Sequence, residues 1–297
     1  MTNDPAATFE PHRRRLRGLA YRMLGSLAEA EDVVQEAYLR WHATARHEVH
    51  DAGAFLTTIT TRLCLDVVKS ARARREEYVG PWLPDPVVDT ASLAPDAQTA
   101  LADDLSVALL LALDRLSPLE RAAFLLHDVF DHSFAQVAAA LGRSEAACRQ
   151  LASRARTRVR QAHPPLPPPP RGAVMDPRHA ALLDAFGRAA RTGDLDTLTR
   201  MLAHDAQLVT DSGGKVPAAM NVIAGADHVA RFLIGVVRKG WTADVEVRPA
   251  VVNDLPALLL VRDGQLVQTT SFQFEGETVT AIYVVRNPDK LHHVLAH

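Results

Sequence analysis

The sequence contains no apolar run long enough to cross a bilayer, and its N-terminus lacks the apolar core of a signal peptide. Cysteine is scarce: Cys64 and Cys148 lie far apart on helical patterns, which argues against a disulfide framework or a Cys-x-x-Cys metal site. We therefore expect a cytoplasmic protein of 297 residues with no membrane contact and no metal site. Its length suffices for two or three domains.

Basic residues are missing from one stretch and concentrated in others. Residues 78–100 contain no Lys or Arg but three Asp, whereas residues 143–160 hold six Arg against one acid, and residues 69–75 hold four cations. The net charge of −2 conceals this clustering. Cations grouped on helices are what phosphate binding requires, although such groups are often only solvated helix faces. The charge pattern alone therefore favours a nucleic-acid partner only weakly.

Two proline-rich stretches divide the chain. Residues 79–96 contain four prolines and no helical period, and residues 163–170 (HPPLPPPP) predict a stiff polyproline spacer. We therefore predict three folded segments and two linkers. The folded segments are 1–77, 103–163 and 176–297, and the linkers are 78–102 and 164–175.

The first two folded segments are predicted to be wholly helical. An apolar stripe ending at Leu24 predicts a helix that Gly25 terminates, and Ser26-Leu27-Ala28-Glu29 is typical of a capping box that opens the next helix. A third helix is expected over about 54–75, with an apolar stripe of Leu56, Ile59, Leu63 and Val67. In the second segment, Ser117-Pro118-Leu119-Glu120 and Ser133-Phe134-Ala135-Gln136 are typical of capping boxes.

The third folded segment combines helices with strands. Helical patterns occur at about 178–191, 195–202 and 226–238, and alternating runs occur at 245–248, 257–262, 265–274 and 278–286. Asp263-Gly264 and Glu275-Gly276 are typical of tight hairpin turns. This segment is therefore predicted to be an α+β domain with a curved antiparallel sheet.

Residues 133–160 fit a helix-turn-helix. Gly142 ends the first helix and Ser144 caps a longer second one, whose inward side is apolar. Its opposite side carries Arg and Gln side chains that can reach base edges and phosphates in a DNA groove. The alternative is a helical hairpin with a polar solvent face.

A second basic helix is expected at 54–75. Arg62, Asp66, Lys69 and Arg72 lie opposite its apolar stripe. Two basic helical units joined by an extended acidic linker can contact two separated DNA boxes, a layout that a single repressor headpiece does not need. The alternative is the exposed surface of a helical bundle.

Three stretches carry a resemblance to a known family. AEDVVQEAYLRW (30–41) resembles the polymerase-clamp-binding helix of the extracytoplasmic-function (ECF) sigma factors, and residues 55–76 resemble their −10-element region. Residues 116–160 are similar to their −35-reading domain. The matches cover about half the chain and follow the family's order. The resemblance implies a sigma factor that directs RNA polymerase to promoters, with core polymerase (its β′ clamp helices and β flap) and promoter DNA as partners.

The resemblance also implies roles for individual residues. The residues expected to bind polymerase are Asp32, Gln35, Glu36 and Arg40. Those expected to contact the −10 element are Arg62, Asp66, Lys69 and Arg72. Those expected to contact the −35 element are Ser144, Arg149, Gln150, Ser153, Arg154 and Arg156. Many members of the family have Asn where Arg62 stands, so their −10 preference is not transferred to this chain.

Three short motifs indicate one group within that family. WLPDP (82–86), DSGGK (211–215) and NPDKL (287–291) resemble its signatures, with Ser212 where the group usually has Gly. In this group a cone-shaped SnoaL-like domain follows the two sigma domains, which implies regulation in cis. The residues expected to make regulatory contacts are Trp82, Leu83, Pro84, Asp85, Pro86, Asp211, Gly213, Gly214, Lys215, Asn287, Pro288, Asp289, Lys290 and Leu291.

An enzyme is the second hypothesis, because SnoaL-like folds elsewhere host isomerases. Asp211 is conceivable as a base, but it lies in a Gly-Gly loop, and Tyr283 alternates with packed strand residues. No nucleophile–base constellation stands out. We therefore predict no catalytic residue, no cofactor and no turnover, and we leave open an unidentified small ligand in the cavity.

A ligand-sensing one-component regulator is the third hypothesis. It accounts for the helix-turn-helix and the C-terminal domain but leaves residues 30–41 and the −10-like helix unexplained. Such a regulator binds duplex operator unaided, with a steep salt dependence. A sigma factor gains specific binding only with core polymerase, so the two hypotheses are separable by experiment.

Overall fold

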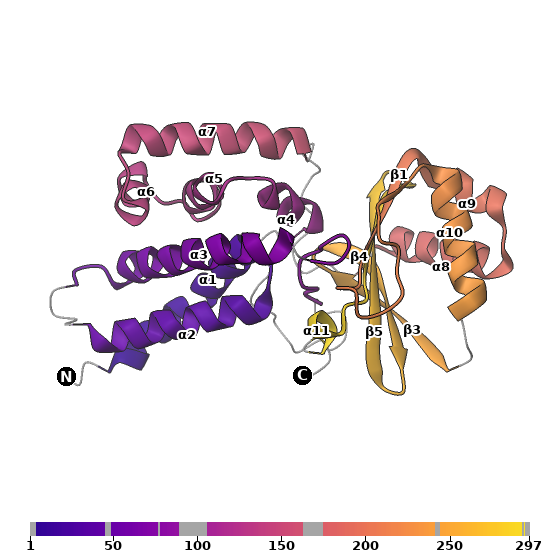
Figure 1. Ribbon diagram of the computed structural model, residues 1–297, viewed down its shortest axis with the longest axis horizontal. Coiled ribbons are helices and arrows are strands. Elements are labelled where there is room, and N and C mark those ends of the chain that lie inside the picture. The colour runs from indigo at the N-terminus through magenta and orange to yellow at the C-terminus, as the bar shows by residue number, and fades with distance from the viewer. Residues whose placement is uncertain are drawn as a thin grey trace. The chain divides into compact units, whose positions relative to one another are not determined.

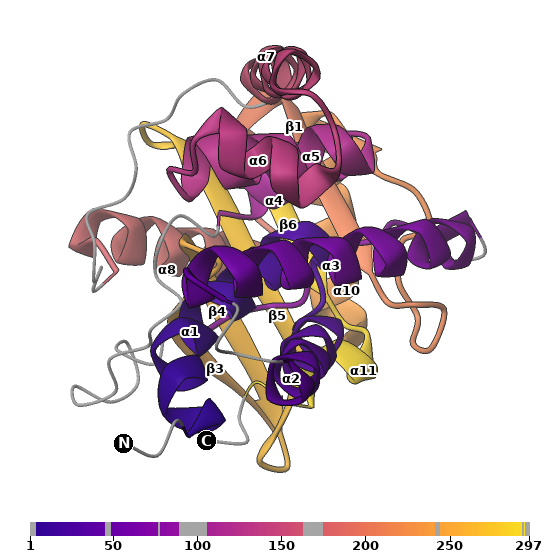
Figure 2. The same ribbon diagram turned by 90° about the vertical axis from the view of Figure 1, so that its left-hand side faces the viewer.

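The chain divides into two structural units, each built from two separate stretches of sequence (Figures 1 and 2). The computed structural model describes residues 4–44, 49–76, 78–88, 106–162, 175–240, 244–292 and 294. Unit 1 comprises residues 1–76 and 108–167, and unit 2 comprises residues 77–107 and 168–297. The predicted linker residues 89–102 and 164–174 lie outside the described part of the chain.

Every regular element in the described part of unit 1 is a helix. Its N-terminal helices are α1 (Pro5–Leu24), α2 (Leu27–Ala43) and α3 (Ala52–Glu76). Its second helical domain contains α4 (Val107–Asp114), α5 (Pro118–Phe124), the π-helical turn η3 (Leu125–Val129), α6 (Phe134–Leu141) and α7 (Glu145–Ala162). In Figure 1, α7 runs along α5 and α6.

The helix boundaries follow the capping signals in the sequence. Gly25 adopts φ 72° and ends α1, Gly142 adopts φ 63° and ends α6, and the Ser26 side chain caps α2. Ser117 and Ser133 both form complete capping boxes, as predicted, whereas at α2 the structure has one half of the predicted box, the hydrogen bond from the Glu29 amide to the Ser26 hydroxyl. The predicted helix ends are confirmed. Each of them depends only on residues within one helical turn, so the local sequence was enough to predict it.

The buried side of α3 differs from the predicted stripe. Ile59, Leu63 and Val67 are only half-buried, whereas Thr60 and Cys64 are fully buried. The reason is that α3 is contacted by α1 and α2 and also by α5 and α6. A helix packed on two sides has no single apolar stripe.

Unit 2 is built around one six-stranded sheet with the order β2-β1-β6-β5-β4-β3. The strands are β1 (Leu202–Asp211), β2 (Ile223–Ala224), β3 (Val245–Val252), β4 (Leu255–Arg262), β5 (Gln265–Glu275) and β6 (Thr278–Val285). The helices are α8 (Pro177–Thr192), α9 (Leu195–Met201), α10 (Ala226–Gly240) and the short α11 (Pro288–Leu291). Figure 1 shows α8, α9 and α10 on one face of the sheet.

Three details of the sheet differ from the sequence prediction. β1 was not predicted, and it pairs in parallel with β6, so the sheet is mixed rather than antiparallel. The β5–β6 turn lies at Gly276-Glu277, one residue later than expected, while Asp263-Gly264 forms the predicted turn with both φ angles positive. A further tight turn, at Asn253 and Asp254 between β3 and β4, was missed.

The hydrophobic core of unit 2 lies between the sheet and its helix layer. Phe186 of α8 packs edge-on against Phe272 of β5, with ring centroids 5.2 Å apart. Ala206 and Leu208 of β1 belong to this core. Side chains along a strand point alternately to the two faces of the sheet. Asp211 lies three residues after Leu208 on β1, so it projects from the opposite face. The three short motifs meet at that residue, as described below.

The predicted fold class is confirmed at the level of architecture: two helical domains and one α+β domain. In the part of the chain that the structure describes, no helix combines the length and apolarity needed to span a membrane.

Candidate functional site

The candidate polymerase-binding residues lie together on the outer surface of α2. Asp32 and Gln35 are exposed, and Glu36 forms an ion pair with Arg40 at 2.8 Å. Leu39, which the sequence analysis did not single out, is 54% exposed on the same helix. The helix therefore presents acidic groups beside an exposed leucine, a combination suited to a partner with both cations and apolar side chains.

The candidate −10 residues on α3 differ in their surroundings. Arg62 donates from Nε to the carbonyl oxygen of Ala140 and from Nη2 to that of Ala139, both at 3.0 Å. Asp66 and Lys69 are exposed and pair with each other at 3.0 Å. The Arg72 side chain lies outside the described residues. In this conformation two donors of Arg62 bind the last turn of α6, within the helix-turn-helix.

Two other arginines join the N-terminal helices to the second helical domain. Arg121 of α5 donates to the carbonyl oxygen of Met23 at 2.6 Å, and Arg15 of α1 donates to that of Phe130 at 2.5 Å. The acceptors lie in the last turn of α1 and directly after η3. Helix C-termini carry unpaired carbonyl groups and partial negative charge, which cations stabilise. We call this packing of the two helical parts of unit 1 the closed arrangement.

The second helix of the helix-turn-helix, α7, has the predicted two-sided character. Cys148, Leu151 and Ala155 are buried, and Gln150 and Ser153 are exposed on the outer face. Ser144 accepts a hydrogen bond from the amide of Ala147 and so caps the helix. Arg149 is exposed, pairs with Glu145 and lies over the Phe134 ring at 5.2 Å. Five of the six predicted −35 residues therefore lie on α7, and the sixth, Ser144, caps its N-terminus.

The two flanks of α7 carry arginines held by carboxylates of the same domain. On one flank, Arg154 and Arg158 both pair with Glu120 of α5, at 3.4 and 2.6 Å. On the other, Arg156 pairs with Asp128 at 2.6 Å. Burial opposes ionisation of Glu120, but hydrogen bonds from Ser117 and the charges of Arg158 and Arg154 outweigh it and lower the pKa of this carboxyl.

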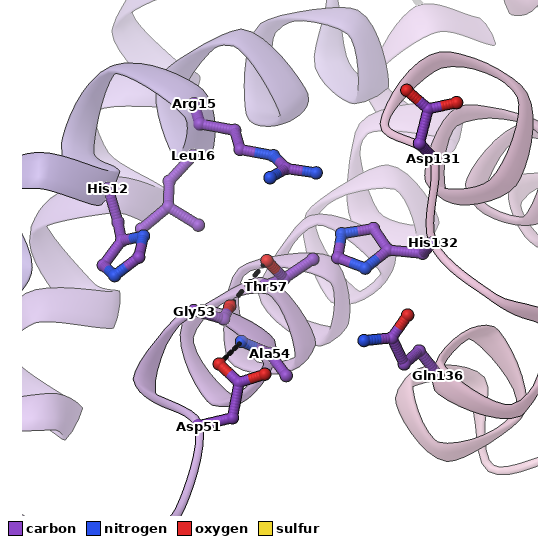
Figure 3. A pocket seen from close by; sticks show the side chains of 10 residues that line it. All are labelled: His12, Arg15, Leu16, Asp51, Gly53, Ala54, Thr57, Asp131, His132 and Gln136. Carbon is purple, nitrogen blue, oxygen red and sulfur yellow. Dashed lines mark hydrogen bonds between the residues drawn. The ribbon is translucent and has the colours of Figure 1, made fainter.

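A cavity of about 340 Å³ lies where α1 and the start of α3 meet the loop before α6 (Figure 3). Arg15 and His132 point toward each other across it, and Asp51 caps α3 at its edge. Burial, followed by the charge of Arg15, lowers the pKa of His132. The cavity exists only while the closed arrangement persists.

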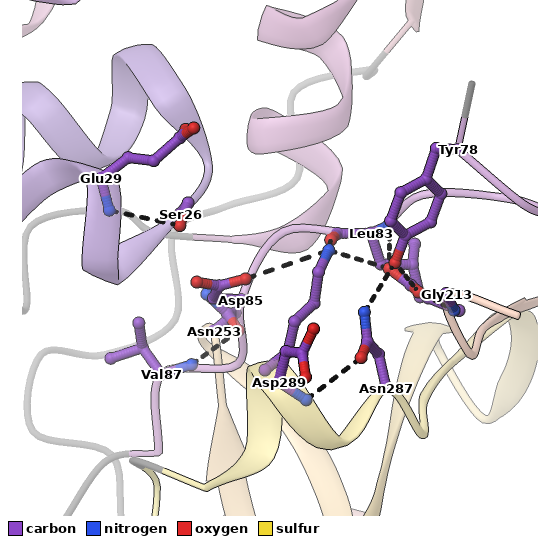
Figure 4. Close-up of polar contacts among 12 residues, drawn as sticks. Ser26, Glu29, Tyr78, Leu83, Asp85, Val87, Gly213, Asn253, Asn287 and Asp289 are labelled. Carbon is purple, nitrogen blue, oxygen red and sulfur yellow. Dashed lines mark hydrogen bonds and ion pairs between the residues drawn. The ribbon is translucent and has the colours of Figure 1, made fainter. Parts of the chain in front are cut away.

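The three short motifs converge on Asp211 in unit 2. Figure 4 shows residues of all three, among them Asp85, Gly213 and Asn287, side by side. Asp211 is 0% exposed, and its carboxylate accepts hydrogen bonds from Tyr78 Oη (2.5 Å), the Leu83 amide (2.8 Å), the Gly213 amide (3.2 Å) and Lys290 Nζ (2.9 Å). A buried carboxylate is stable only when hydrogen bonds and an opposite charge replace its water, and Asp211 has both. We call residues 78–88 the connector and this cluster the clasp.

Lys290 is the cation of the clasp. Besides Asp211, it lies 3.9 Å from Asp85 and donates to the carbonyl oxygen of Leu83. Its Nζ also lies over the Trp82 ring, 4.5 Å from the centroid. The side chains of Asp85 and Lys290 are nearly buried. WLPDP and NPDKL are therefore joined by one desolvated ammonium group.

The two glycines of DSGGK are required by the close approach of neighbouring side chains. A Cβ on Gly213 would come within 2.5 Å of Asn287 Nδ2, and one on Gly214 within 2.9 Å of Val79 Cβ. Both residues have positive φ angles. Glycine thus allows the connector and NPDKL to pack directly on this loop.

The remaining motif residues support the same cluster. Asn287 caps α11 through the Asp289 amide and donates to Tyr78 Oη, while Lys215 pairs with Asp289 on the surface. Pro288 is the first residue of α11, and the motif residues Leu83, Pro84, Pro86 and Leu291 are buried.

Sequence analysis missed Tyr78 and Asn253. Burial, together with the hydrogen bond to Asp211, raises the pKa of Tyr78, which therefore remains a neutral donor. Asn253 exchanges hydrogen bonds with Val87 through both its side chain and its amide, and Val88 bridges to Val252 beside it. The signal available was the Asn-Asp pair between two strands, which is typical of a tight turn.

The two residues weighed for catalysis have partners within the chain. Four donors hold the buried Asp211 carboxylate, and Tyr283 donates to Gln273 on the neighbouring strand at 3.0 Å. Among the described residues, no group of three or more His, Cys, Asp or Glu is placed to hold a metal ion.

Comparison with known proteins identifies both helical parts of unit 1. Residues 8–74 match the family model for sigma-70 region 2, and residues 106–159 match the model for sigma-70 region 4. These matches define the class: a two-region transcription initiation factor with an appended α+β domain.

Full-length relatives define the family within that class. The ECF RNA polymerase sigma factor SigJ of Mycobacterium tuberculosis is 44% identical over 232 residues, which cover 78% of this chain and 72% of the relative. The probable ECF sigma factor SigI of the same organism is 33% identical over 297 residues, covering 97% and 96%. The crystal structure of SigJ aligns over 96% of this chain and 97% of that chain, with a TM-score of 0.73 and 36% identity. The chain belongs to the extracytoplasmic-function RNA polymerase sigma factors.

Proposed function

We propose that this chain works in the cytoplasm, directing RNA polymerase to promoters through the α2 surface and two DNA-contacting helices, without catalytic turnover. Asp32, Gln35, Glu36 and Arg40 bind the β′ clamp helices, and the second helical domain lies on the β flap. The exposed acidic face of α2 supports the first contact. Region 2 spans 1–77 and region 4 spans 103–163, with the regulatory domain at 176–297.

DNA contact is divided between two helices in this proposal. Arg62, Asp66, Lys69 and Arg72 on α3 contact the −10 element, and the outer face of α7 contacts the −35 element. The observation that carries this assignment is the two-sided α7 helix, with an apolar face packed inward and an Arg- and Gln-bearing face in solvent.

We further propose that the C-terminal domain regulates the sigma regions in cis by holding the connector. The clasp supports this role, because it fixes the chain between region 2 and region 4 to the C-terminal domain through buried contacts. The connector begins the longer stretch 78–100, which holds four prolines and three Asp but no Lys or Arg, a composition that suits a passage lined by basic groups in the polymerase. Residues held in the clasp are withheld from such a passage.

Run-off transcription with the purified full-length chain tests the central proposal. We expect specific transcripts only when the chain and core polymerase are both present, and little specific binding to duplex promoter by the chain alone. A one-component regulator gives the reverse: operator binding without polymerase, with a steep salt dependence. Tight, sequence-specific duplex binding by the free chain would therefore refute the sigma-factor proposal.

The closed arrangement withholds Arg62 from the −10 element in the free chain, while Asp66 and Lys69 stay exposed. Arg62 uses the same donors for the α6 carbonyls that it would use for DNA, so it cannot serve both at once. We expect Arg62→Ala to increase about tenfold the population of molecules in which regions 2 and 4 are apart, because two charge-assisted hydrogen bonds are lost. Förster transfer between dyes on the exposed surfaces of α2 and α7 measures this.

Lys69→Ala is the matched control for the Arg62 variant. Lys69 lies on the same helix but pairs with Asp66, not with region 4, so its loss should leave the transfer efficiency unchanged. Equal efficiencies in wild type and Arg62→Ala would show that Arg62 does not hold the regions together.

A further inference from the structure

Glu120 unites two tasks in one buried carboxylate. Its Oε2 accepts from the amide (3.1 Å) and the hydroxyl (2.7 Å) of Ser117, which closes the capping box of α5. The same oxygen accepts from Arg158 Nη1 at 2.6 Å, and Oε1 lies 3.4 Å from Arg154 Nε. The capping box does not require a charge, because Gln136 completes the equivalent box of Ser133 with a neutral side chain.

The two arginines are oriented and still accessible. Arg154 and Arg158 are 61% and 51% exposed, whereas the Glu120 side chain is 5% exposed. They lie one turn apart on α7, where two guanidinium groups otherwise repel each other. Each guanidinium has five N–H donors, and the contacts to Glu120 leave most of them directed to solvent. The result is a rigid pair of cations on one flank of the DNA-reading helix.

A helix in the major groove has a phosphate backbone along each flank, while its central face meets the bases. Gln150 and Ser153 occupy the central face of α7, and Arg156 lies on the opposite flank, held by Asp128. Both flanks therefore have a cation fixed by a carboxylate of region 4.

We propose that Glu120 is a positioning residue that holds Arg154 and Arg158 as a two-arginine clamp for the phosphate backbone beside the −35 element. This inference rests on the proposed −35 role of α7 and adds Arg158 and Glu120 to the residues that act there. The clamp supplies affinity and register rather than base selectivity.

The decisive variant is Glu120→Gln, which keeps the capping box and removes the ion pairs. In holoenzyme made with this variant, we expect affinity for promoter DNA to fall about fivefold at every salt concentration, because two long side chains must be ordered on binding. The salt slope should stay at the wild-type value, since both arginines remain. In contrast, Arg154→Ala/Arg158→Ala should reduce that slope by about two.

Two further variants distinguish the positioning of the arginines by Glu120 from an effect of net charge and from a structural role of Glu120. In Glu120→Gln/Gln136→Glu the carboxylate moves to the neighbouring capping box and the net charge is restored. We expect this variant to bind as weakly as Glu120→Gln alone. In the Arg154→Ala/Arg158→Ala background, Glu120→Gln should have no additional effect on DNA affinity, although a merely structural role would still lower it.

Unchanged or tighter promoter binding by Glu120→Gln overturns the positioning role, as does recovery in the charge-restored variant. Failure of the proposed function has a different signature, because wild-type chain and core polymerase would then give no promoter-specific complex.

Discussion

Replacing Asp32 and Glu36 by lysine is expected to abolish association with core RNA polymerase while unit 1 remains folded. Asp32 is exposed and Glu36 is half-exposed on the outer surface of α2, where Glu36 pairs with Arg40 of the same helix. Charge reversal places two cations against a basic partner surface, and like charges across an interface cost several kcal/mol. We expect at least a 100-fold loss of affinity, about 3 kcal/mol, in a titration of labelled chain with core enzyme.

A matched control changes the net charge equally at sites far from α2 in sequence. Asp184→Lys/Glu246→Lys also reverses two exposed carboxylates, each of which pairs with a nearby arginine as Glu36 does. This control should bind core polymerase like the wild type at moderate ionic strength. Equal losses in both double variants would mean that overall charge, not the α2 surface, governs association.

A variant at Leu39 tests whether the contact between α2 and core polymerase is partly apolar. It is the exposed leucine on α2, so Leu39→Ala should weaken core binding without the salt dependence that the lysine variants produce. A contact that is partly apolar is distinguished in this way from one that is purely electrostatic.

The sequence predicted best what is determined locally. Ser117, Ser133 and Gly142 fix helix ends through contacts within one turn, and the structure has each of them as expected. The inward and outward sides of α7 were also predictable, because that helix packs on one side only. The family resemblance located the three motifs of the clasp, although it gave no geometry for them.

What could not be predicted depends on partners distant in the sequence. The Tyr78 hydroxyl meets Asp211 across 133 positions, and β1 pairs with β6 in parallel, so no short-range pattern reveals either contact. Arg62 appeared as a free DNA-contacting residue because its acceptors, 77 and 78 residues away, belong to the second helical domain. Periodicity shows which side of a helix is polar, but not which surface covers it.

Replacing Asp211 by alanine is expected to break the clasp and release the connector. The substitution leaves the buried Lys290 ammonium without its closest carboxylate and removes the acceptor for Tyr78 Oη and the Leu83 amide. Removing one partner of a buried ion pair costs about 3–5 kcal/mol, since the other charge remains desolvated. Hydrogen exchange read by mass spectrometry should show loss of amide protection across the connector.

Lys215→Ala is the control for the Asp211 variant. Lys215 belongs to the same motif and pairs with Asp289, but both side chains are more than half exposed, so the pair is worth at most about 1 kcal/mol. Protection of the connector should therefore persist in Lys215→Ala. If both variants lost protection equally, burial of Asp211 would not be the source of the clasp's strength.

Run-off transcription by the Asp211 variant tests whether the clasp regulates the sigma regions. A connector freed from the C-terminal domain no longer has to leave Asp211 and Lys290 before it can enter the polymerase, so Asp211→Ala should give more run-off product than wild type at equal polymerase occupancy. Adding Lys290→Met to Asp211→Ala removes the stranded cation and should recover part of the stability without restoring connector protection. The double variant thus separates damage to the domain fold from release of the connector. If the double variant is stable and its connector unprotected, but its transcription equals that of wild type, the clasp has a structural role only.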